Sequence, residues 1–241
     1  MVADSPRAAD EDGDYDDEEE TYVLHNAAEQ GHVDRLRELL PLPSECSDPP
    51  PRLSVLSSET NLLEKDDMGF LPLHVAVIHQ QTDCALHLLR YSPALTSAML
   101  RLKGGDFGTP FLHLVLRVGA INASFSQVIV NELCKEETND RFYGEDVRTL
   151  LFEKVAARDE EGNTVFHLCA RYDLVSCLDV FASFYRRQLA VMETQEAAGD
   201  GEKKKKLLKL ETLLEKGNKV GFRPLHEAMK YQATGVARKF C

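Results

Sequence analysis

The chain has 241 residues, of which 43% are hydrophobic, and it carries a formal net charge of -12 at pH 7. This length permits one large domain or two small ones. No run of about 18 or more apolar residues occurs, so we predict no membrane-spanning segment within the chain. The first twenty residues are acidic instead of basic and then apolar, so we predict no secretory signal.

The negative charge is concentrated near the N-terminus. Residues 4–20 contain ten acidic side chains and one basic side chain, Arg7, so the rest of the chain is close to neutral. This composition is typical of a disordered, solvated segment, and we predict an acidic tail over residues 1–20. Docking of the tail on a basic partner is the alternative to a purely solubilising role. Because an acidic chain repels phosphate groups, we predict no nucleic-acid binding.

The cysteines indicate the redox compartment. None of the six belongs to a Cys-x-x-Cys pair; they are Cys46, Cys84, Cys134, Cys169, Cys177 and Cys241. In a chain of this length without a secretory signal, the pattern predicts reduced thiols and a cytoplasmic location. We expect Cys84, Cys169 and Cys177 to lie on packed helices, where a free thiol behaves as a small hydrophobic group.

A short internal repeat is the main feature of residues 21–241. A leucine or phenylalanine followed by histidine occurs five times, as Leu24-His25, Leu73-His74, Leu112-His113, Phe166-His167 and Leu225-His226. In four copies a glycine stands a few residues earlier: Gly69, Gly108, Gly162 and Gly221. Repeats of this kind are small units that must stack on one another to bury their hydrophobic faces. We therefore predict one repeat domain over residues 21–241.

The first repeat is predicted near residues 21–40. Leucines recur there at helical spacing, and Gly31 divides the segment into two short helices. Pro41 ends the second helix. A Pro/Ser-rich insert of irregular or polyproline character follows over residues 41–60.

The other four repeats are predicted near residues 66–91, 105–134, 159–182 and 218–241. In the second repeat Gln80 holds the place that Gly31 holds in the first. In the third, Gly119 marks the break and the second helix extends to about Cys134.

A charged insert over residues 186–217 separates the last two repeats. It contains four consecutive lysines at 203–206. We interpret them as part of a flexible loop leading into a helix, because leucines follow at helical spacing. A nuclear signal and a contact to lipid head groups are the alternatives.

Each position of the signature has a physical role. Glycine after a polar turn residue provides a backbone conformation that other residues resist. Thr or Asn beside a Pro is expected to cap and begin a helix, because Pro at the first helical position lacks only an N–H that would be unpaired anyway. The Leu is expected to point into the stack, where burying it contributes about 1.5–3 kcal/mol.

These positions resemble the ankyrin repeat, whose pattern is Asp-x-x-Gly-x-Thr-Pro-Leu-His-x-Ala. The matching residues are Asp66, Gly69, Pro72, Leu73, His74 and Ala76 in the second repeat, Asp159, Gly162, Thr164 and His167 in the fourth, and Asn218, Gly221, Pro224, Leu225, His226 and Ala228 in the fifth. The resemblance implies an all-α ankyrin-repeat solenoid of about five helix-turn-helix repeats with long finger loops. It also implies a protein partner bound through the finger loops and the concave face.

The spacing resembles one subgroup of ankyrin domains. The Leu/Phe-His pairs are 49, 39, 54 and 59 residues apart, whereas the ordinary ankyrin period is about 33. Irregular spacing, together with the segments 157–167, 208–211 and 218–225, is similar to the cytosolic N-terminal ankyrin domain of vanilloid-type transient receptor potential (TRP) cation channels. That resemblance implies an assembly and regulatory domain of a calcium-conducting channel at the cytosolic face of the plasma membrane, with sister subunits as partners.

The chemistry expected of the signature residues is structural. The five histidines belong to different repeats, so we expect a column of imidazoles that brace loops by hydrogen bonds, and no metal site. Asp106-Phe107-Gly108 copies the metal-binding triplet of kinases, but no Gly-rich loop or catalytic-loop motif accompanies it. No Ser-His-Asp, Cys-His or paired-carboxylate arrangement can be assigned from spacing alone. We predict no catalytic residue, no cofactor and no enzyme activity.

Two further hypotheses stand beside the channel domain. The first is a stand-alone cytosolic ankyrin adaptor, which the absence of an apolar span favours. The second is an enzyme carried on an ankyrin scaffold, which no motif supports.

Overall fold

The computed structural model describes residues 22–42, 62–91, 93–105, 108–135, 145–198 and 209–240. The predicted acidic tail, nearly all of the Pro/Ser-rich insert and the four lysines at 203–206 lie outside these ranges. The described chain is mostly helical, so the predicted all-α class is confirmed.

The helices are α1 (Val23–Gln30), α2 (Val33–Leu39), α4 (Pro72–Ile78), α5 (Thr82–Tyr91), α6 (Pro93–Arg101), α7 (Phe111–Gly119), α8 (Ala123–Cys134), α10 (Glu145–Ala156), α11 (Val165–Arg171), α12 (Val175–Ala198), α13 (Leu210–Glu215), α14 (Pro224–Lys230) and α15 (Thr234–Phe240). Two short strands, β1 (Lys103–Gly104) and β2 (Thr109–Pro110), pair antiparallel. Within the described ranges, none of the helices combines the length and the apolar character needed to cross a membrane.

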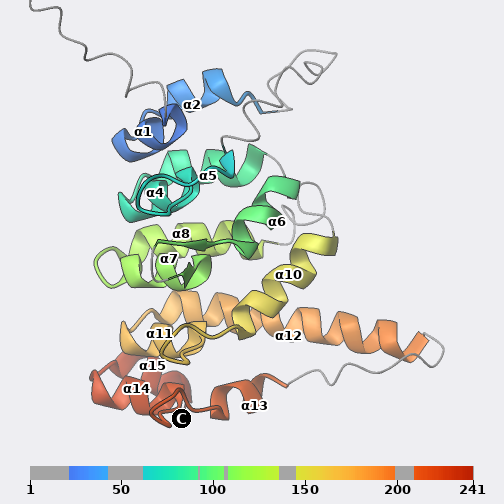
Figure 1. The fold of residues 1–241 in the computed structure, drawn as a ribbon. Helices are drawn as coiled ribbons and strands as arrows, with labels where there is room; N and C mark the ends of the chain where they lie inside the picture. Colours follow the sequence, from blue (N-terminus) through green and yellow to red (C-terminus); the bar gives the residue numbers. More distant parts are fainter. Residues whose placement is uncertain are drawn as a thin grey trace, which may run out of the picture.

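Most helices form antiparallel pairs that stack in chain order (Figure 1). We number the pairs 1 to 5: α1/α2, α4/α5, α7/α8, α11/α12 and α14/α15. The first helix of each pair packs on the first helix of the next, and the second helices pack on one another in the same order. Each pair therefore buries one face on its predecessor and one on its successor, except at the two ends of the stack.

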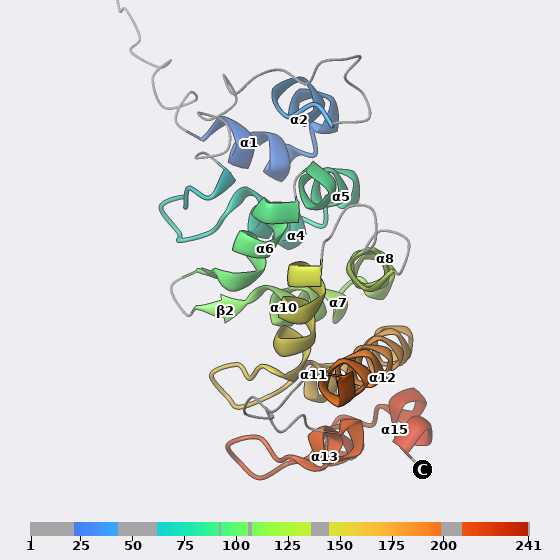
Figure 2. The same cartoon turned by 90° about the vertical axis from the view of Figure 1, so that its right-hand side faces the viewer.

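The loops that lead into pairs 2 to 5 project from one side of the stack (Figure 2). Their described parts are residues 64–71, 102–105 with 108–110, 157–164 and 216–223, and we call them together the loop edge. First helices lie between this edge and the column of second helices (Figure 2). The loops thus form one edge that draws on four distant parts of the sequence.

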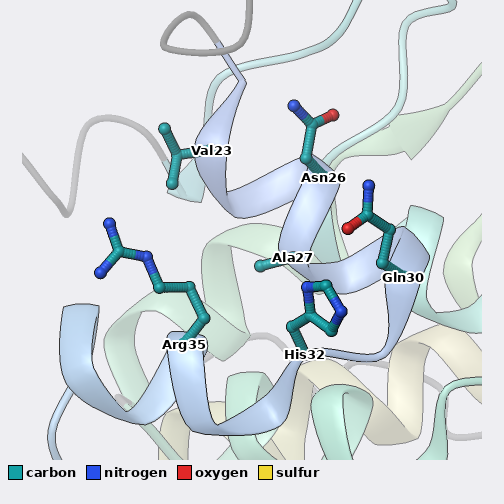
Figure 3. A pocket seen from close by; sticks show the side chains of 6 residues that line it. All are labelled: Val23, Asn26, Ala27, Gln30, His32 and Arg35. Atoms are coloured by element: carbon teal, nitrogen blue, oxygen red, sulfur yellow. The ribbon is translucent and has the colours of Figure 1, made fainter.

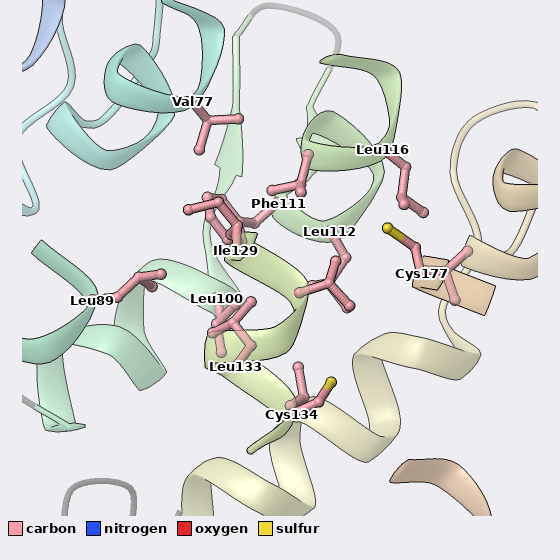
Figure 4. Packing of buried hydrophobic residues seen from close by; sticks show 14 of the residues in the cluster. Val77, Leu89, Leu100, Phe111, Leu112, Leu116, Ile129, Leu133, Cys134 and Cys177 are labelled. Carbon is pink, nitrogen blue, oxygen red and sulfur yellow. The ribbon is translucent and has the colours of Figure 1, made fainter. Parts of the chain in front are cut away.

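One hydrophobic core runs through the stack. Leu24, Leu73, Leu112 and Phe166 are at most 5% exposed, whereas the corresponding Leu225 is only half-buried. Figure 4 shows side chains from pairs 2, 3 and 4 in one continuous cluster, from Val77 to Cys177. Cys84, Cys169 and Cys177 are buried on helices, as predicted.

The turn between the helices of a pair is built in two ways. Gly31, Gln80, Asp173 and Gln232 all have positive φ, so each reverses the chain in the left-handed region. Gly119 does mark the break, since α7 ends there, but it is not among the glycines with positive φ. A Cβ there would lie 2.7 Å from Oγ of Ser126, so this glycine is needed for the close approach of α7 and α8.

The helix starts also differ from expectation. No Thr or Asn side chain caps α4, α11 or α14 through its own oxygen. Instead the backbone N–H of Leu71, Thr164 and Arg223 donates to Nδ1 of the histidine three residues later, at 3.2, 3.1 and 3.1 Å. The imidazole at the third helical position reaches back to the cap in the way that a Glu or Gln does in a capping box.

The structure differs from the sequence-based expectation in two segments. Helices α6 and α10 lie outside the five pairs and pack on each other. Helix α12 continues to Ala198, so the predicted insert 186–217 begins inside a helix. The helix is anchored just before residue 186, because Phe184 and Tyr185 are buried. The ring of Tyr185 stacks on that of Phe152 in α10, with the ring centroids 4.3 Å apart.

Candidate interaction surface

Three loops of the edge have the same construction. In the loop before pair 2, Oδ1 of Asp66 accepts the backbone N–H of Met68 at 3.0 Å and of Phe70 at 2.7 Å. The backbone N–H of Gly69 donates to the carbonyl of Asp66, with Gly69 at φ +78°. The same set of bonds recurs at Asp159 and at Asn218. A side-chain acceptor at this position fixes the turn, as Asp and Asn do in other Asx turns.

The loop before pair 3 is different because Gly105 occupies the position of Asp66. Gly108 donates its backbone N–H to the carbonyl of Gly105 at 3.1 Å, and the loop is held by the short β1/β2 ladder. Asp106 and Phe107 of the kinase-like triplet lie outside the described residues.

The signature histidines connect each pair to the loop of the next one. Nε2 of His25 donates to the carbonyl of Phe70 at 3.1 Å. His113 bonds the carbonyl of Asn163 and His167 that of Phe222, both at 2.9 Å. In each case the acceptor is the residue directly after the turn glycine: Gly69, Gly162 or Gly221. The imidazoles therefore form a column of cross-links between neighbouring units.

His74 does not make this cross-link. Nε2 of the fully buried His74 has no hydrogen-bond partner among the described residues. The backbone of Gly104 lies against the ring instead, since a Cβ there would be 2.6 Å from Cδ2 of His74. Burial lowers the pKa of His74 to about 4, so the ring is neutral at pH 7.

The two contacts of His167 require a neutral ring. Burial lowers the pKa of both His113 and His167, although their bonds to backbone carbonyls act in the opposite direction. In His167, a neutral ring with its proton on Nε2 donates to the carbonyl of Phe222 while Nδ1 accepts the N–H of Thr164, whereas Nδ1 of His113 has no partner among the described residues. A protonated ring would lose the second contact.

Neighbouring loops are also joined through their backbones. The N–H of Gly105 donates to the carbonyl of Gly69 at 3.0 Å, and the N–H of Lys219 donates to that of Glu161 at 2.9 Å. These two backbone hydrogen bonds join the loop before pair 2 to the loop before pair 3, and the loop before pair 4 to the loop before pair 5.

A buried polar network joins pairs 4 and 5. Arg171 donates to Glu227 at 3.1 Å and to the more exposed Glu161 at 3.1 Å. Asn218 donates to Oδ1 of Asn163 and to Oε1 of Glu227, both at 2.9 Å. Sequence reasoning did not identify this network. The available signal was an acidic residue directly after His226, where other repeats have Val75, Leu114 and Leu168.

Exposed apolar side chains occupy two tips of the loop edge. Met68 is 64% exposed and Val220 is 76% exposed, and each directly precedes the turn glycine of its loop. Apolar residues at the tips of otherwise polar turns have no role in the core. We name Met68 and Val220 the loop tips; the sequence signal for them was an apolar residue inside an Asp/Asn–Gly turn, which was not singled out.

A hollow lies at the N-terminal end of the stack, between α1 and α2 (Figure 3). It is lined by Val23, Asn26, Ala27, Gln30, His32 and Arg35 and has a volume of about 180 Å³. Typical small-molecule sites are roughly 300–1,000 Å³ and mainly apolar. This hollow is smaller and largely polar, so it does not have the form of a cofactor site.

Nothing in the described residues gathers metal-ligating groups. No set of three or more His, Cys, Asp or Glu side chains in those ranges is placed to hold an ion. Burial raises the pKa of the Cys134, Cys169 and Cys177 thiols, so they are poor nucleophiles. The geometry offers the extended loop edge for contacts with macromolecules.

Comparisons with known proteins do not assign the chain. No family model matches it, and no curated protein matches it either.

Proposed function

We propose that this chain is an ankyrin-type repeat module that binds a protein partner through its loop edge. The observation that carries the proposal is the column of imidazole cross-links, in which His25, His113 and His167 each bond the residue after the next turn glycine. Such a column supports a rigid row of loops. Rigid loops with exposed apolar tips are suited to protein recognition, because little conformational entropy is lost on binding.

We further propose that the module is the cytosolic N-terminal assembly and regulatory domain of a vanilloid-type TRP-like cation channel. The support for this step is the sequence resemblance over residues 157–167, 208–211 and 218–225, together with the long connections between repeats. Its partners would be sister subunits at the cytosolic face of the plasma membrane. A stand-alone cytoplasmic adaptor is the alternative.

The loop tips provide the first test. The double variant Met68→Asp/Val220→Asp should lose proteins that the natural chain captures from a cell extract, because a charge in an apolar contact costs binding energy. Ile121→Asp is the matched control, since Ile121 is 82% exposed but lies in the turn at the far end of α7 from its loop. Unchanged capture by the double variant would contradict binding through the loop edge.

The full transcript provides the second test. The channel proposal expects the reading frame to continue into six apolar spans of about 20 residues each. A reading frame without such spans would overturn the channel assignment and leave the adaptor. The loop-tip test is independent of this result.

A further inference from the structure

Three like charges meet where α6 and α10 end beside the loop edge. Arg101 is the last residue of α6, and Lys154 lies in the last turn of α10. The two helices pack on each other (Figure 2), and Lys103 of β1 follows Arg101 by two residues. We call Arg101, Lys103 and Lys154 the basic cluster.

The cations of the basic cluster repel one another and lack anionic partners. Burial lowers the pKa of Lys154, and the charges of Arg101 and Lys103 lower it further. Glu153 acts in the opposite direction but is the weakest of these influences. In the described ranges no carboxylate forms an ion pair with any of the three cations. A cation in the last turn of a helix is favourable by itself, but three cations brought together still favour a bound anion.

The described chain begins close to this cluster. Tyr22, the first described residue, donates its hydroxyl to Oδ1 of Asp67 at 3.2 Å, so it lies at the loop before pair 2. In the same loop, Nζ of Lys65 donates to the backbone carbonyl of Lys103 at 3.0 Å. Packed helices are about 10 Å apart, and an extended chain covers about 3.3 Å per residue. A few residues are therefore enough to lead from Tyr22 to Lys103.

Charge favours residues 4–20 of the same chain as the occupant. They contain ten acidic side chains and one basic side chain, and we call them the acidic segment. The basic cluster and Lys65 offer four cations to it. Covalent attachment gives the segment a high effective concentration at a nearby surface, which a separate acidic protein lacks. Lys219 and Arg223 are also exposed, but they lie at the opposite end of the loop edge.

We propose that the acidic segment binds the basic cluster of its own chain through ion pairs. Its carboxylates pair with Lys103 and Lys154 across the ends of α6 and α10, and Lys65 adds a fourth cation from the loop before pair 2. Because the contact is ionic and lies within one chain, salt releases it and dilution of the protein does not. The inference depends neither on partner binding at the loop tips nor on the channel assignment.

Zero-length cross-linking of the full chain tests the contact. A carbodiimide joins carboxylates to amines that touch them, and mass spectrometry maps the products. In the monomer we expect links from residues 4–20 to Lys65, Lys103 or Lys154. They should decrease by about fivefold or more between about 0.1 M and about 1 M salt, as the Debye length falls from about 10 Å to about 3 Å. Lys219 is the control, since it is exposed on the same edge and should form few such links.

Charge variants test both sides of the contact. Replacing the five acids at 16–20 with Asn or Gln should speed acetylation of Lys103 and Lys154 by about threefold or more, because an ion-paired amine stays protonated. Acetylation of Lys219 should not change. The double variant Lys103→Glu/Lys154→Glu should lose the cross-links to Lys65, whereas the matched control Lys219→Glu/Lys230→Glu should keep them.

Four results would overturn the proposal. Equal acetylation of Lys103 and Lys154 with and without the acids at 16–20 would show that the cluster is free. Cross-links spread equally to Lys219 would indicate unspecific attraction. Links found only in cross-linked dimers would make a second copy the donor of the segment. Protection of the two lysines that appears only on addition of polyglutamate would assign the cluster to a separate acidic partner.

Discussion

The junction between pairs 4 and 5 and the junction between pairs 2 and 3 begin from the same signature but are built differently. At the first, both ring nitrogens of His167 are bonded, and the Arg171–Glu227 ion pair is buried beside them. At the second, Nε2 of His74 has no partner among the described residues, and the ring meets Phe111 edge-on with centroids 5.8 Å apart.

The difference shows that the histidine has two separable roles. Capping of its own helix through Nδ1 is made at both junctions. Cross-linking through Nε2 is made only where the next loop places a carbonyl within reach. At the junction between pairs 2 and 3, close packing on Gly104 takes the place of the cross-link at His74. The ion pair of this junction lies between the second helices instead, where Arg90 of α5 donates to the buried Glu132 of α8 at 2.7 and 2.8 Å. Four experiments can break or sharpen this comparison.

The largest effect is expected from a core leucine at the junction between pairs 2 and 3. Leu73→Ala should lower the free energy of unfolding by about 2–5 kcal/mol, because a fully buried side chain leaves a cavity. Leu225→Ala should cost less, roughly 1–2 kcal/mol, since that leucine is only half-buried in the last pair. Urea denaturation of both variants measures the difference. Equal losses would mean that Leu225 is covered in solution.

The next effect concerns the junction between pairs 4 and 5. Glu227→Ala should lower the free energy of unfolding by about 3 kcal/mol, because it removes the buried carboxylate that pairs with Arg171 and one of the two acceptors of the Asn218 amide. Glu161→Ala removes the exposed carboxylate from the same arginine and should cost less than about 1 kcal/mol. If the two variants were equally stable, the buried pair would contribute nothing beyond a surface ion pair.

A smaller effect is expected from the glycine that replaces the cross-link. Gly104→Ala should cost about 1–3 kcal/mol, because its Cβ would lie 2.6 Å from the His74 ring. In a His74→Ala background the same substitution should cost markedly less, since the ring is gone. A double-mutant cycle measures this coupling. Additive losses would show that the glycine is required by its own backbone and not by the ring.

The smallest effect over a single pH unit is the pH dependence that His74 gives to the junction between pairs 2 and 3. The pKa of His74 is about 4 in the folded chain, below the ordinary value of 6.5, so only the unfolded chain takes up the proton between these values. Stability should therefore fall as the pH drops from about 6.5 toward 4, by up to roughly 1.4 kcal/mol per pH unit.

His74→Gln should flatten this part of the stability profile, because glutamine does not titrate. The exposed His226→Gln is the matched control and should leave the slope unchanged. Urea midpoints between pH 7 and pH 4 provide the measurement. A slope that His74→Gln leaves intact would assign the acid sensitivity to other groups.

Much of the local structure followed from short-range sequence. The five Leu/Phe-His pairs predicted helix starts, and helices begin next to all of them. Turns with Asp66, Asp159 and Asn218 three residues before a glycine were also readable, because Asx turns are made by neighbouring residues. The sequence-based prediction failed where contacts between distant residues determine the local structure. The predicted charged insert begins inside α12, and that helix depends on the burial of Phe184 and Tyr185.

The sequence alone determined the number of signatures, the helical class and the nearly neutral charge of the chain outside residues 4–20. Only the stacking decided which imidazole finds a carbonyl, because the acceptors of His25, His113 and His167 lie 45 to 55 residues further along the chain. It also decided that Glu227 is buried and that Met229 is exposed. A repeat pattern specifies what each unit offers to its neighbours, whereas the contacts made depend on whether a neighbour is there.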